Sequence, residues 1–345
     1  MIRNRLRRMA KSNELYVFLV ILLIYAIVSI ISPVFFSAYS VVSVLKTAIE
    51  PLIYAVGAYL VILSGGIDIT VAGIGAFSMF TATKIVYEMN YEGSALLPYV
   101  LAVAFGTGLG MINGLLISRL KIPPMIATLG MNSIINGVML FFIGSREISR
   151  VPIGILTAGR TYLLTVYNAN GVAAPLSTTV FIAIALLIIM FLFLRYTMLG
   201  ANIFAIGGNT ESAMRAGINV PNTQLIVYTI AGALYGLGGM VHTITYVNSN
   251  PMDLIGQEMI TIAAVIIGGA RITGGHGTLT GTVLGVLLIQ LVNNCLNTVG
   301  IPTYWQRFVV GMVLVIGTSL TAYQALKEKR KLHVEISPAP QTTKE

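Results

Sequence analysis

Charged residues are scarce in this chain of 345 residues. Only 10% of the residues are Asp, Glu, Lys or Arg, whereas 56% are hydrophobic, and the mean hydropathy is +0.86. Soluble domains carry roughly 25% charged residues, so these values exclude a soluble domain. Runs of about 20 apolar residues, the length that a bilayer core requires, instead indicate a polytopic membrane protein.

Signatures of several chemistries are missing as well. Cys295 is the only cysteine, so the chain forms no intrachain disulfide and has none of the usual cysteine spacings of metal sites. No GxxxxGK[ST] segment occurs, so the chain cannot cradle a nucleotide by that route. No His/Asp or Cys/His cluster stands at a useful spacing, which disfavours a membrane enzyme. We therefore expect no catalytic residue and no metal site.

Ten apolar stretches are long enough to be membrane spans. They cover about residues 14–32, 41–63, 67–87, 95–118, 123–143, 177–194, 222–247, 256–272, 276–299 and 303–325. We expect an all-α polytopic membrane protein with about ten transmembrane helices at 14–325, after a basic segment at 1–13. The first stretch has no small-residue cleavage site and is expected to remain uncleaved. The polar, proline-containing tail 326–345 is expected to be disordered.

The basic residues are unevenly distributed between the two sides of these spans. With the amino terminus inside, the outer side holds Lys84, Arg146, Arg150, Arg160 and Arg307. Lys46 falls within a span, and the other fifteen of the 21 Lys and Arg residues lie inside. Cytoplasmic loops carry such an excess, so we expect both termini and the loop 195–221 to be cytoplasmic, in the cell (inner) membrane. The net charge of +9 then reflects orientation and contact with anionic membrane lipid, with no need for nucleic acid.

The loop 195–221 contains a predicted helix about two turns long. Side-chain oxygens can cap its start, an acid lies in its first turn, a base follows at i+4, and a glycine supplies a left-handed residue at its end. These residues are, in order, Asn209 or Thr210, Glu211, Arg215 and Gly217. Such a short helix is not stable alone in water. It is either an ordinary capped surface helix or one that docks into a partner protein.

A double glycine interrupts the helical pattern between the second and third spans. Gly65 and Gly66 are followed by Asp68 and Thr70. Irregular backbone at membrane depth must be covered by protein or water, so we expect this segment in the interior or at the cytoplasmic mouth. Asp68 either caps the third helix through a following amide or shapes a gate. GGARIT at 268–273 repeats four of the six residues of GGIDIT and indicates similar local geometry.

Several polar side chains lie within the predicted spans. Glu50 follows Lys46 at i+4, so we expect the two to pair, the alternative being contact with solute. His242 is expected to be a hydrogen-bonded structural group. Amide side chains either bond neighbouring helices or bind hydroxyl groups in a solute path. They are Asn113, Asn132, Asn136, Gln290, Asn293 and Asn294.

Two glycine triplets at four-residue spacing predict close helix packing. They are Gly106, Gly110 and Gly114 in the fourth span, and Gly277, Gly281 and Gly285 in the ninth. We interpret both as packing surfaces and not as ligand contacts. The longest outer segment, 144–176, offers a polar surface either to an extracytoplasmic protein or to lipid headgroups.

Four segments of the sequence, taken together, form a distinctive pattern. They are SGGIDITVAGIGAF from Ser64, NGLLISRLKIPPMIATLG from Asn113, AIGGNTESAMRAGINV in the loop 195–221, and IGGARITGGHGTLTGTVLGVLLI from Ile267. In this order, over roughly residues 15–325, they resemble segments of the ribose-type permeases, the membrane subunits of bacterial ABC importers for sugars and related small polar molecules. The first resembles the family's GGIDLSVGS segment, the third its cytoplasmic coupling loop, and the fourth its GGxxxxGGxGTxxG segment.

The resemblance implies a permease subunit that moves a sugar or sugar-like solute by alternating access. It implies a second permease subunit, as a homodimer or heterodimer, two cytoplasmic ATP-binding subunits that dock at the coupling loop, and an extracytoplasmic solute-binding protein. ATP is then used by the partner subunit, and this chain needs no cofactor. The candidate gate and pathway residues are Glu50, Gly65, Gly66, Asp68, Thr70, Asn113, Asn132, Gln290 and Asn293.

Two departures from the family's pattern leave the solute open. IDITVAGIG stands where IDLSVGSV-like strings are usual, and Arg271 stands where an apolar or hydroxyl residue is more common. The rival interpretation is an ion-coupled secondary carrier or channel, for which Glu50 and Asp68 provide the acids that such proteins generally need within the membrane.

Overall fold

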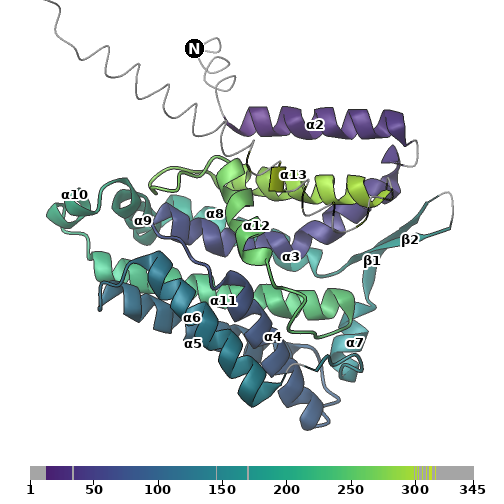
Figure 1. Cartoon of the computed structure of the whole chain (residues 1–345), viewed down its shortest axis with the longest axis horizontal. Helices are drawn as coiled ribbons and strands as arrows, with labels where there is room; N and C mark the ends of the chain where they lie inside the picture. The colour runs from purple at the N-terminus through teal and green to yellow at the C-terminus, as the bar shows by residue number, and fades with distance from the viewer. Residues whose placement is uncertain are drawn as a thin grey trace, which may run out of the picture.

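The computed structural model describes residues 13–32, 35–144, 146–168 and 171–298, together with scattered positions between 300 and 315. Most of its long helices run along the longest axis of the molecule (Figure 1). In chain order the elements are α2 (Asn13–Ile31), α3 (Ala38–Leu63), α4 (Val71–Glu88), α5 (Leu96–Ser118), α6 (Pro124–Val138), the π-helix η2 (Met139–Ile143), α7 (Ile153–Gly159), β1 (Tyr162–Tyr167), β2 (Ala173–Ser177), α8 (Val180–Tyr196), α9 (Met198–Gly208), α10 (Thr210–Arg215), α11 (Val220–Tyr246), α12 (Gln257–Ile267) and α13 (Leu279–Thr298).

Six helical segments of the described chain are long and apolar enough to cross a membrane. They are α2, α3, α5, α6 with η2, α11 and α13. The helices α8 and α9 are bent by 74° and pass the same test only as one broken span. The structure is therefore that of a mostly helical protein with several membrane-spanning candidates, and the expected count of ten is not confirmed.

The difference in count has identifiable sources. The helix α12 has 11 residues, and at about 1.5 Å per residue it is too short to cross a hydrocarbon core of about 30 Å. The expectation of a full span at 256–272 is therefore wrong. The helix α4 occupies the third predicted stretch but is not one of the six candidates. Most of the predicted tenth span 303–325, and the tail 326–345, lie outside the described residues.

The helices α3 and α11 form the buried centre of the bundle. Every residue from Ile53 to Leu63 of α3 is buried. The helix α11 packs against α3, α4 and α5. A Cβ atom on Gly106 or Gly110 of α5 would collide with backbone atoms of Gly232 in α11. The two backbones are therefore in direct contact, and the triplet that includes Gly114 lies on this packing surface.

The second glycine triplet, predicted in the ninth span, is only partly helical. Gly281 and Gly285 of α13 lie against the carbonyl oxygens of Gly268 and Ala264 at the end of α12. Gly277, in contrast, is not helical, because it precedes α13 and has φ +154°. The prediction that Gly277 belongs to a helical stripe is wrong, because α13, the helix of the predicted ninth span, begins only at Leu279.

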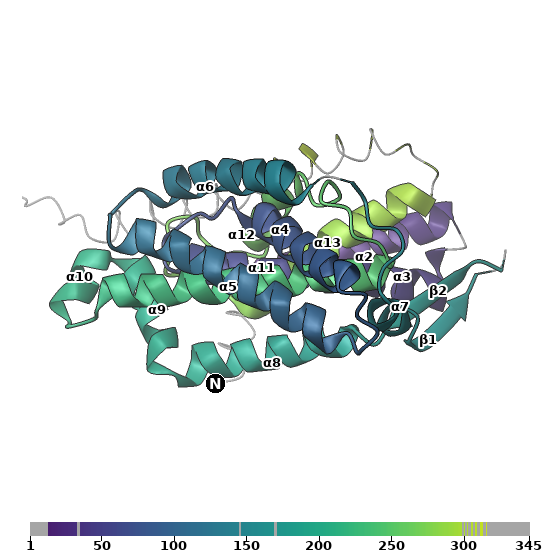
Figure 2. The ribbon, with the colours of Figure 1, turned by 90° about the horizontal axis from the view of Figure 1, so that it is seen from below.

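The peripheral helices have the exposed apolar surface of lipid-facing segments. Figure 2 shows α6 and α8 on opposite sides of the molecule, with the central helices between them. Exposed side chains of α8 include Phe181, Ile184, Ile188 and Ile189. A helix that is hydrophobic all round needs an apolar environment, so the outer face of α8 fits lipid.

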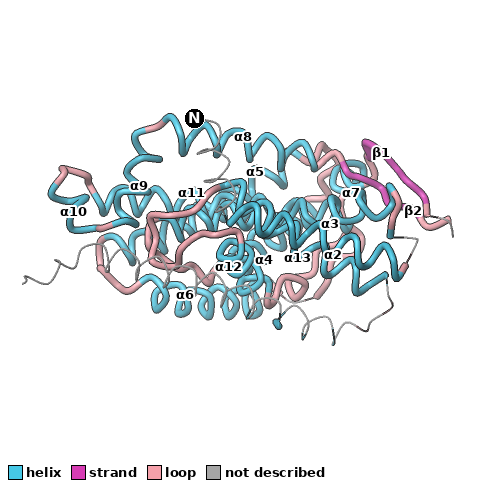
Figure 3. The backbone as a smooth tube through the Cα atoms, turned by 90° about the horizontal axis from the view of Figure 1, so that it is seen from above, coloured by secondary structure: helices cyan, strands magenta, loops and turns pink. Residues whose placement is uncertain are grey.

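The predicted outer segment 144–176 is more regular than expected. It contains α7 and most of an antiparallel hairpin formed by β1 and β2. The hairpin stands at one end of the molecule, whereas α10 lies at the other end (Figure 3). The all-α expectation is therefore wrong for this segment, where YLLTVY supplies the aromatic and β-branched residues that favour strands.

Candidate functional site

The irregular segment between α3 and α4 is held by a buried hydrogen-bond network. Asp68 is 2% exposed, and its Oδ1 accepts hydrogen bonds from the amide of Thr70, at 2.8 Å, and from the Thr70 hydroxyl. Asn113 of α5 donates from Nδ2 to the Thr70 hydroxyl at 2.8 Å. The predicted contact of Asp68 with the Thr70 amide is therefore present, although Thr70 is itself the N-cap residue of α4 and no side-chain hydrogen bond caps that helix. The network also ties the broken segment to α5.

Two buried tyrosines of α11 belong to the same region. Tyr228 and Tyr235 lie close enough to Asp68 for electrostatic interaction, and a Cβ on Gly66 would collide with the Tyr228 hydroxyl. The sequence analysis missed these tyrosines because they are about 160 residues away along the chain. Several other polar residues occur in the same helix, so nothing in the sequence marks these two tyrosines.

Three glycine-containing segments that are far apart in the sequence meet beside the broken segment. A Cβ on Gly274 would lie 2.8 Å from the Cα atoms of both Gly65 and Gly207, and one on Gly275 would lie 2.6 Å from the Cα of Gly208. The amide of Gly275 donates to the carbonyl oxygen of Leu63 at 2.9 Å. We call Gly65, Gly207, Gly274 and Gly275 the glycine junction.

The geometry of the glycine junction needs residues without side chains. Gly65, Gly274 and Gly275 have φ values of +85°, +87° and +70°, in the region that favours glycine. Gly207 has an ordinary helical φ but is surrounded by backbone. The junction therefore joins the C-terminal ends of α3 and α9 and the loop before α13 through backbone atoms alone.

The short helix of the loop 195–221 forms as the sequence predicts. Asn209 provides the cap, because its Oδ1 accepts from the Ser212 amide at 2.8 Å, and Gly217 has the left-handed φ of +84°. Arg215 and Glu211 form an exposed ion pair with an N–O distance of 2.6 Å.

The chain itself supplies a support for α10. The buried Ala213 packs with Ile206 of α9 and Val220 of α11. Opposite this contact, Glu211, Arg215 and Met214 are exposed. One residue, Asn209, separates α10 from α9, so α10 is carried by the helix that reaches the glycine junction.

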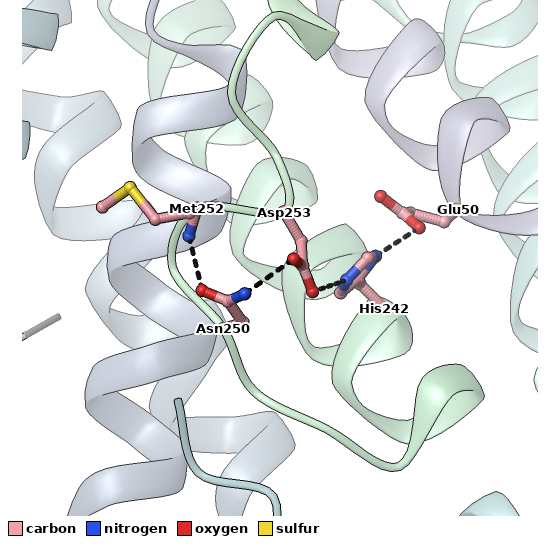
Figure 4. Close-up of polar contacts among 5 residues, drawn as sticks. All are labelled: Glu50, His242, Asn250, Met252 and Asp253. Atoms are coloured by element: carbon pink, nitrogen blue, oxygen red, sulfur yellow. Dashed lines mark hydrogen bonds and ion pairs between the residues drawn. The ribbon is translucent and has the colours of Figure 1, made fainter. Parts of the chain in front are cut away.

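A second polar network lies towards the other end of α11 (Figure 4). The Nδ1 of His242 is 2.7 Å from Oε2 of Glu50 in α3, and its Nε2 is 3.5 Å from Oδ2 of Asp253. Asn250 donates to Asp253 at 2.9 Å and accepts from the Met252 amide at 3.0 Å. The network therefore joins α3 and α11 to the segment between α11 and α12.

The expected pairing of Lys46 with Glu50 is wrong. Among the described residues no ion pair joins the two, and the carboxylate of Glu50 contacts His242 instead. The i, i+4 rule considers only partners on the same helix, whereas His242 is 192 residues away in sequence. His242 is hydrogen-bonded, as the sequence analysis expected.

A hollow opens between α4, α6 and the segment before α12. Its cavity volume is about 40 Å³, and its wall includes Asn132 and Asn136 of α6. The buried Oδ1 of Asn132 has no hydrogen-bond partner among the described residues. Asn132 is therefore the one candidate pathway residue that lines this hollow. We call it the α4–α6 hollow; its lining is Ala72, Gly73, Ala76, Asn132, Asn136, Pro251, Ile255 and Glu258.

The remaining amide candidates lie on α13. Gln290 is 9% exposed, and Asn293 is half-buried. Asn294 donates to the carbonyl oxygen of Gln290 and, at 2.9 Å, to the Thr47 hydroxyl of α3. Asn294 thus bonds two helices. The structure does not bring Gln290 or Asn293 into the α4–α6 hollow.

Comparisons with known proteins agree on one family. Residues 40–317 match the family described as the branched-chain amino acid transport system / permease component. The chain is 32% identical to the ribose import permease protein RbsC of Escherichia coli K12 over 298 residues, which cover 86% of this chain and 89% of that protein. It is 35% identical to the ribose import permease protein RbsC of Bacillus subtilis 168 over 307 residues, 88% of this chain and 91% of that protein.

A second group of relatives is named for a different sugar. The chain is 30% identical to the galactose/methyl galactoside import permease protein MglC of Escherichia coli K12 over 332 residues, 92% of this chain and 96% of that protein. No solved structure matches the chain. The matches extend over nearly the full length of these relatives, and the described helices are apolar enough to cross a membrane several times. The chain is thus a multi-pass membrane protein that belongs to the branched-chain amino acid transport system permease family.

Proposed function

We propose that this chain is the permease subunit of an ABC importer that carries a sugar or a sugar-like small polar solute across the cytoplasmic membrane. The carrying observation is its similarity to ribose and galactose/methyl galactoside import permeases over 86% and 92% of its length. On this proposal the chain is not an enzyme and needs no cofactor. A separate ATP-binding subunit hydrolyses ATP.

The helix α10 is the docking element for the ATP-binding subunit. It presents an exposed acid, an exposed base and an exposed Met214, and it is attached to α9, which ends at the glycine junction. A displacement of α10 would be transmitted through Gly207 to Gly65 and Gly274, whose backbones are in contact with Gly207. Asp68 lies three residues beyond Gly65, so this route leads to the broken segment.

The arrangement of the ends supports the proposed orientation. Glu14 at the start of α2 accepts hydrogen bonds from Thr278 and Thr280, in and after the loop that contributes Gly274 and Gly275. The start of α2 therefore lies beside the loop that contributes Gly274 and Gly275, whereas α10 lies at one end of the molecule and α7 with the β1–β2 hairpin lies at the other (Figure 1). The first end is cytoplasmic in this proposal. The hairpin end receives an extracytoplasmic solute-binding protein.

Alternating access then follows from two permease subunits that face each other across a central pathway. Closure of the ATP-binding subunits moves the two α10 helices, and the broken segments with Asp68, Thr70 and Asn113 change the side on which the pathway is open. The hydrogen bonds of Thr70 to Asp68 and Asn113 make this segment able to move with α5 as one unit.

The experiment is uptake by proteoliposomes that contain this chain, its cognate ATP-binding subunit and the solute-binding protein. Radiolabelled D-ribose and D-galactose serve as probes. We expect uptake that requires ATP and the binding protein, is inhibited by vanadate and resists ionophores. Uptake that ionophores abolish and vanadate leaves intact would instead identify an ion-coupled secondary carrier.

A further inference from the structure

The lipid-facing helix α8 ends in an arginine. The helix has 17 residues, and at about 1.5 Å per residue it covers most of a hydrocarbon core of about 30 Å. Ile188 and Ile189 on its outer face are exposed and fit lipid. Arg195, in the last turn of α8, is exposed as well. The helix therefore places the Arg195 guanidinium where the hydrocarbon core ends and the phospholipid headgroups begin.

Two aromatic rings hold this guanidinium. The Arg195 Cζ lies 5.6 Å from the ring centroid of Phe191, one helical turn earlier, and 5.7 Å from that of Tyr196. An aromatic face attracts a cation without occupying its N–H groups in hydrogen bonds to oxygen. The two rings thus position the guanidinium and leave its donors for an anion.

Arg195 forms no ion pair with a carboxylate in the part of the chain that the structure describes, whereas Arg215 pairs with Glu211. The helix dipole favours a base in the last turn of a helix, which accounts for a cation at this position. It does not account for the apolar and aromatic neighbours, because Tyr196 and Met198 are 71% and 81% exposed. A cation beside an exposed tyrosine, at the end of an apolar helix, is typical of the membrane–water interface.

The chain leaves the lipid directly after Arg195. The helix α9 follows α8 at an angle of 74°, and Figure 2 shows it turning from the end of α8 towards α10. Gly200, Ile203 and Ile206 of α9 are buried, so α9 runs into the protein. The exposed side chains at the turn therefore remain at the surface of the bilayer. We call this surface the α8–α9 corner; it consists of Phe191, Arg195, Tyr196 and Met198.

The charge of the α8–α9 corner favours one class of phospholipid. A guanidinium binds phosphate through parallel charge-assisted hydrogen bonds. In phosphatidylcholine the choline group compensates the phosphate charge, whereas phosphatidylglycerol keeps a net negative charge. Near an anionic membrane surface one basic residue changes binding about fivefold. With no acidic partner beside it, Arg195 retains this full preference.

We propose that the α8–α9 corner binds the headgroup of an anionic phospholipid, with Arg195 as the phosphate-binding residue and Tyr196 and Met198 at the boundary of the acyl chains. The proposal requires only that the chain spans a membrane and is independent of the transported solute. The helix α9 begins three residues after Arg195 and reaches the glycine junction at Gly207. The bound lipid therefore holds one end of the helix that carries α10.

The test measures lipid binding at the α8–α9 corner by fluorescence quenching. Trp305 is the only tryptophan of the sequence, so Tyr196→Trp in a Trp305→Phe background places a single indole there and keeps a ring beside Arg195. The full-length protein is reconstituted into phosphatidylcholine vesicles that contain increasing fractions of dibrominated phosphatidylglycerol or dibrominated phosphatidylcholine. Bromine quenches at contact, so the two curves give the relative binding constants. We expect phosphatidylglycerol to bind about fivefold more strongly.

Three variants in this background identify the group responsible. Arg195→Gln should lower the ratio of the two binding constants to about one, and Arg195→Lys, which keeps the charge, should retain a preference for phosphatidylglycerol. Arg160→Gln is the matched control, because Arg160 is also exposed but lies at the end of α7, at the opposite end of the molecule from α10 (Figure 1). It should leave the ratio unchanged. Equal melting temperatures in phosphatidylcholine vesicles establish that the variants are folded.

Equal binding of the two lipids by the parent protein would overturn the proposal. It would also be overturned by a preference that survives Arg195→Gln, since another part of the surface would then be responsible, or by a loss of preference in Arg160→Gln, which would indicate a general effect of charge. Inorganic phosphate, compared with chloride at equal ionic strength, should leave the ratio unchanged. If phosphate abolishes the preference, the α8–α9 corner is a site for a soluble anion and not for a lipid.

Discussion

Replacement of Gly207 by alanine tests whether the glycine junction transmits movement from α10 to the membrane helices. Gly207 is buried near the C-terminal end of α9. A Cβ atom there would collide with the carbonyl oxygen of Leu63 and the amide nitrogen of Gly275, closer than the 3.0 Å below which real Cβ atoms are essentially never found. Both atoms belong to the backbone, so no side chain can rotate away. The variant must separate α9 from α3 or distort the loop at Gly275.

Gly208 provides the matched control, because nothing lies within 4 Å of a Cβ built on it. Both glycines occupy the last turn of α9, and alanine favours a helix over glycine by up to about 1 kcal/mol at either position. Overpacking costs about 1–3 kcal/mol and applies only to Gly207→Ala. The difference between the two variants thus isolates the collision, which corresponds to about 5- to 150-fold in a conformational equilibrium.

The assay compares uptake, ATPase activity and thermal stability of the reconstituted importer. We expect Gly208→Ala to transport at the wild-type rate. Gly207→Ala should remain in the membrane and keep its ATP-binding subunit active, but its uptake per ATP hydrolysed should fall at least fivefold. If the two variants are indistinguishable in uptake and in melting temperature, Gly207 is not in backbone contact with α3 and the proposed route is wrong.

Three further predictions concern charge and orientation. Asp68→Asn keeps an acceptor for the Thr70 amide but removes the charge, so we expect loss of uptake at normal membrane abundance, and full activity would show that Asp68 acts only as a cap. Glu211→Arg should weaken co-purification of the ATP-binding subunit and abolish transport. The double variant Glu211→Arg with Arg215→Glu restores the ion pair within α10 but leaves the charges that a partner would meet reversed, so it should not restore transport. Restored transport would show that the ion pair only stabilises α10. In a Cys295→Ser background, Asn209→Cys should resist a membrane-impermeant thiol reagent in intact cells, and labelling would overturn the proposed topology.

Features that depend on neighbouring residues could be predicted from the sequence. The cap at Asn209, the i, i+4 pair of Glu211 with Arg215 and the left-handed Gly217 all involve residues within one or two helical turns. The contact of Asp68 with the Thr70 amide spans two residues. In each case the backbone geometry of a turn or helix end fixes which atoms can meet, so the residue types are sufficient.

Features that depend on contacts between distant parts of the chain could not be predicted from the sequence. Glu50 has a suitable partner on its own helix, yet His242 of α11 takes its carboxylate, and nothing in the sequence ranks the two. The apolar stretch at 256–272 has the composition of a span, but the helix begins after Gly256, at φ +90°, and ends at Gly268. A short helix packed in the interior and a full span have the same composition over these residues.

The glycine junction shows how a local signal gains meaning from the fold. The match between GGIDIT and GGARIT indicated only similar local geometry. In the structure these segments meet, and Gly275 bonds the end of α3. Flexible side chains at a contact can adjust and absorb a small displacement, whereas touching backbones leave no such freedom. A displacement of α10 must therefore either break this contact or move the end of α3, and with it the segment that holds Asp68.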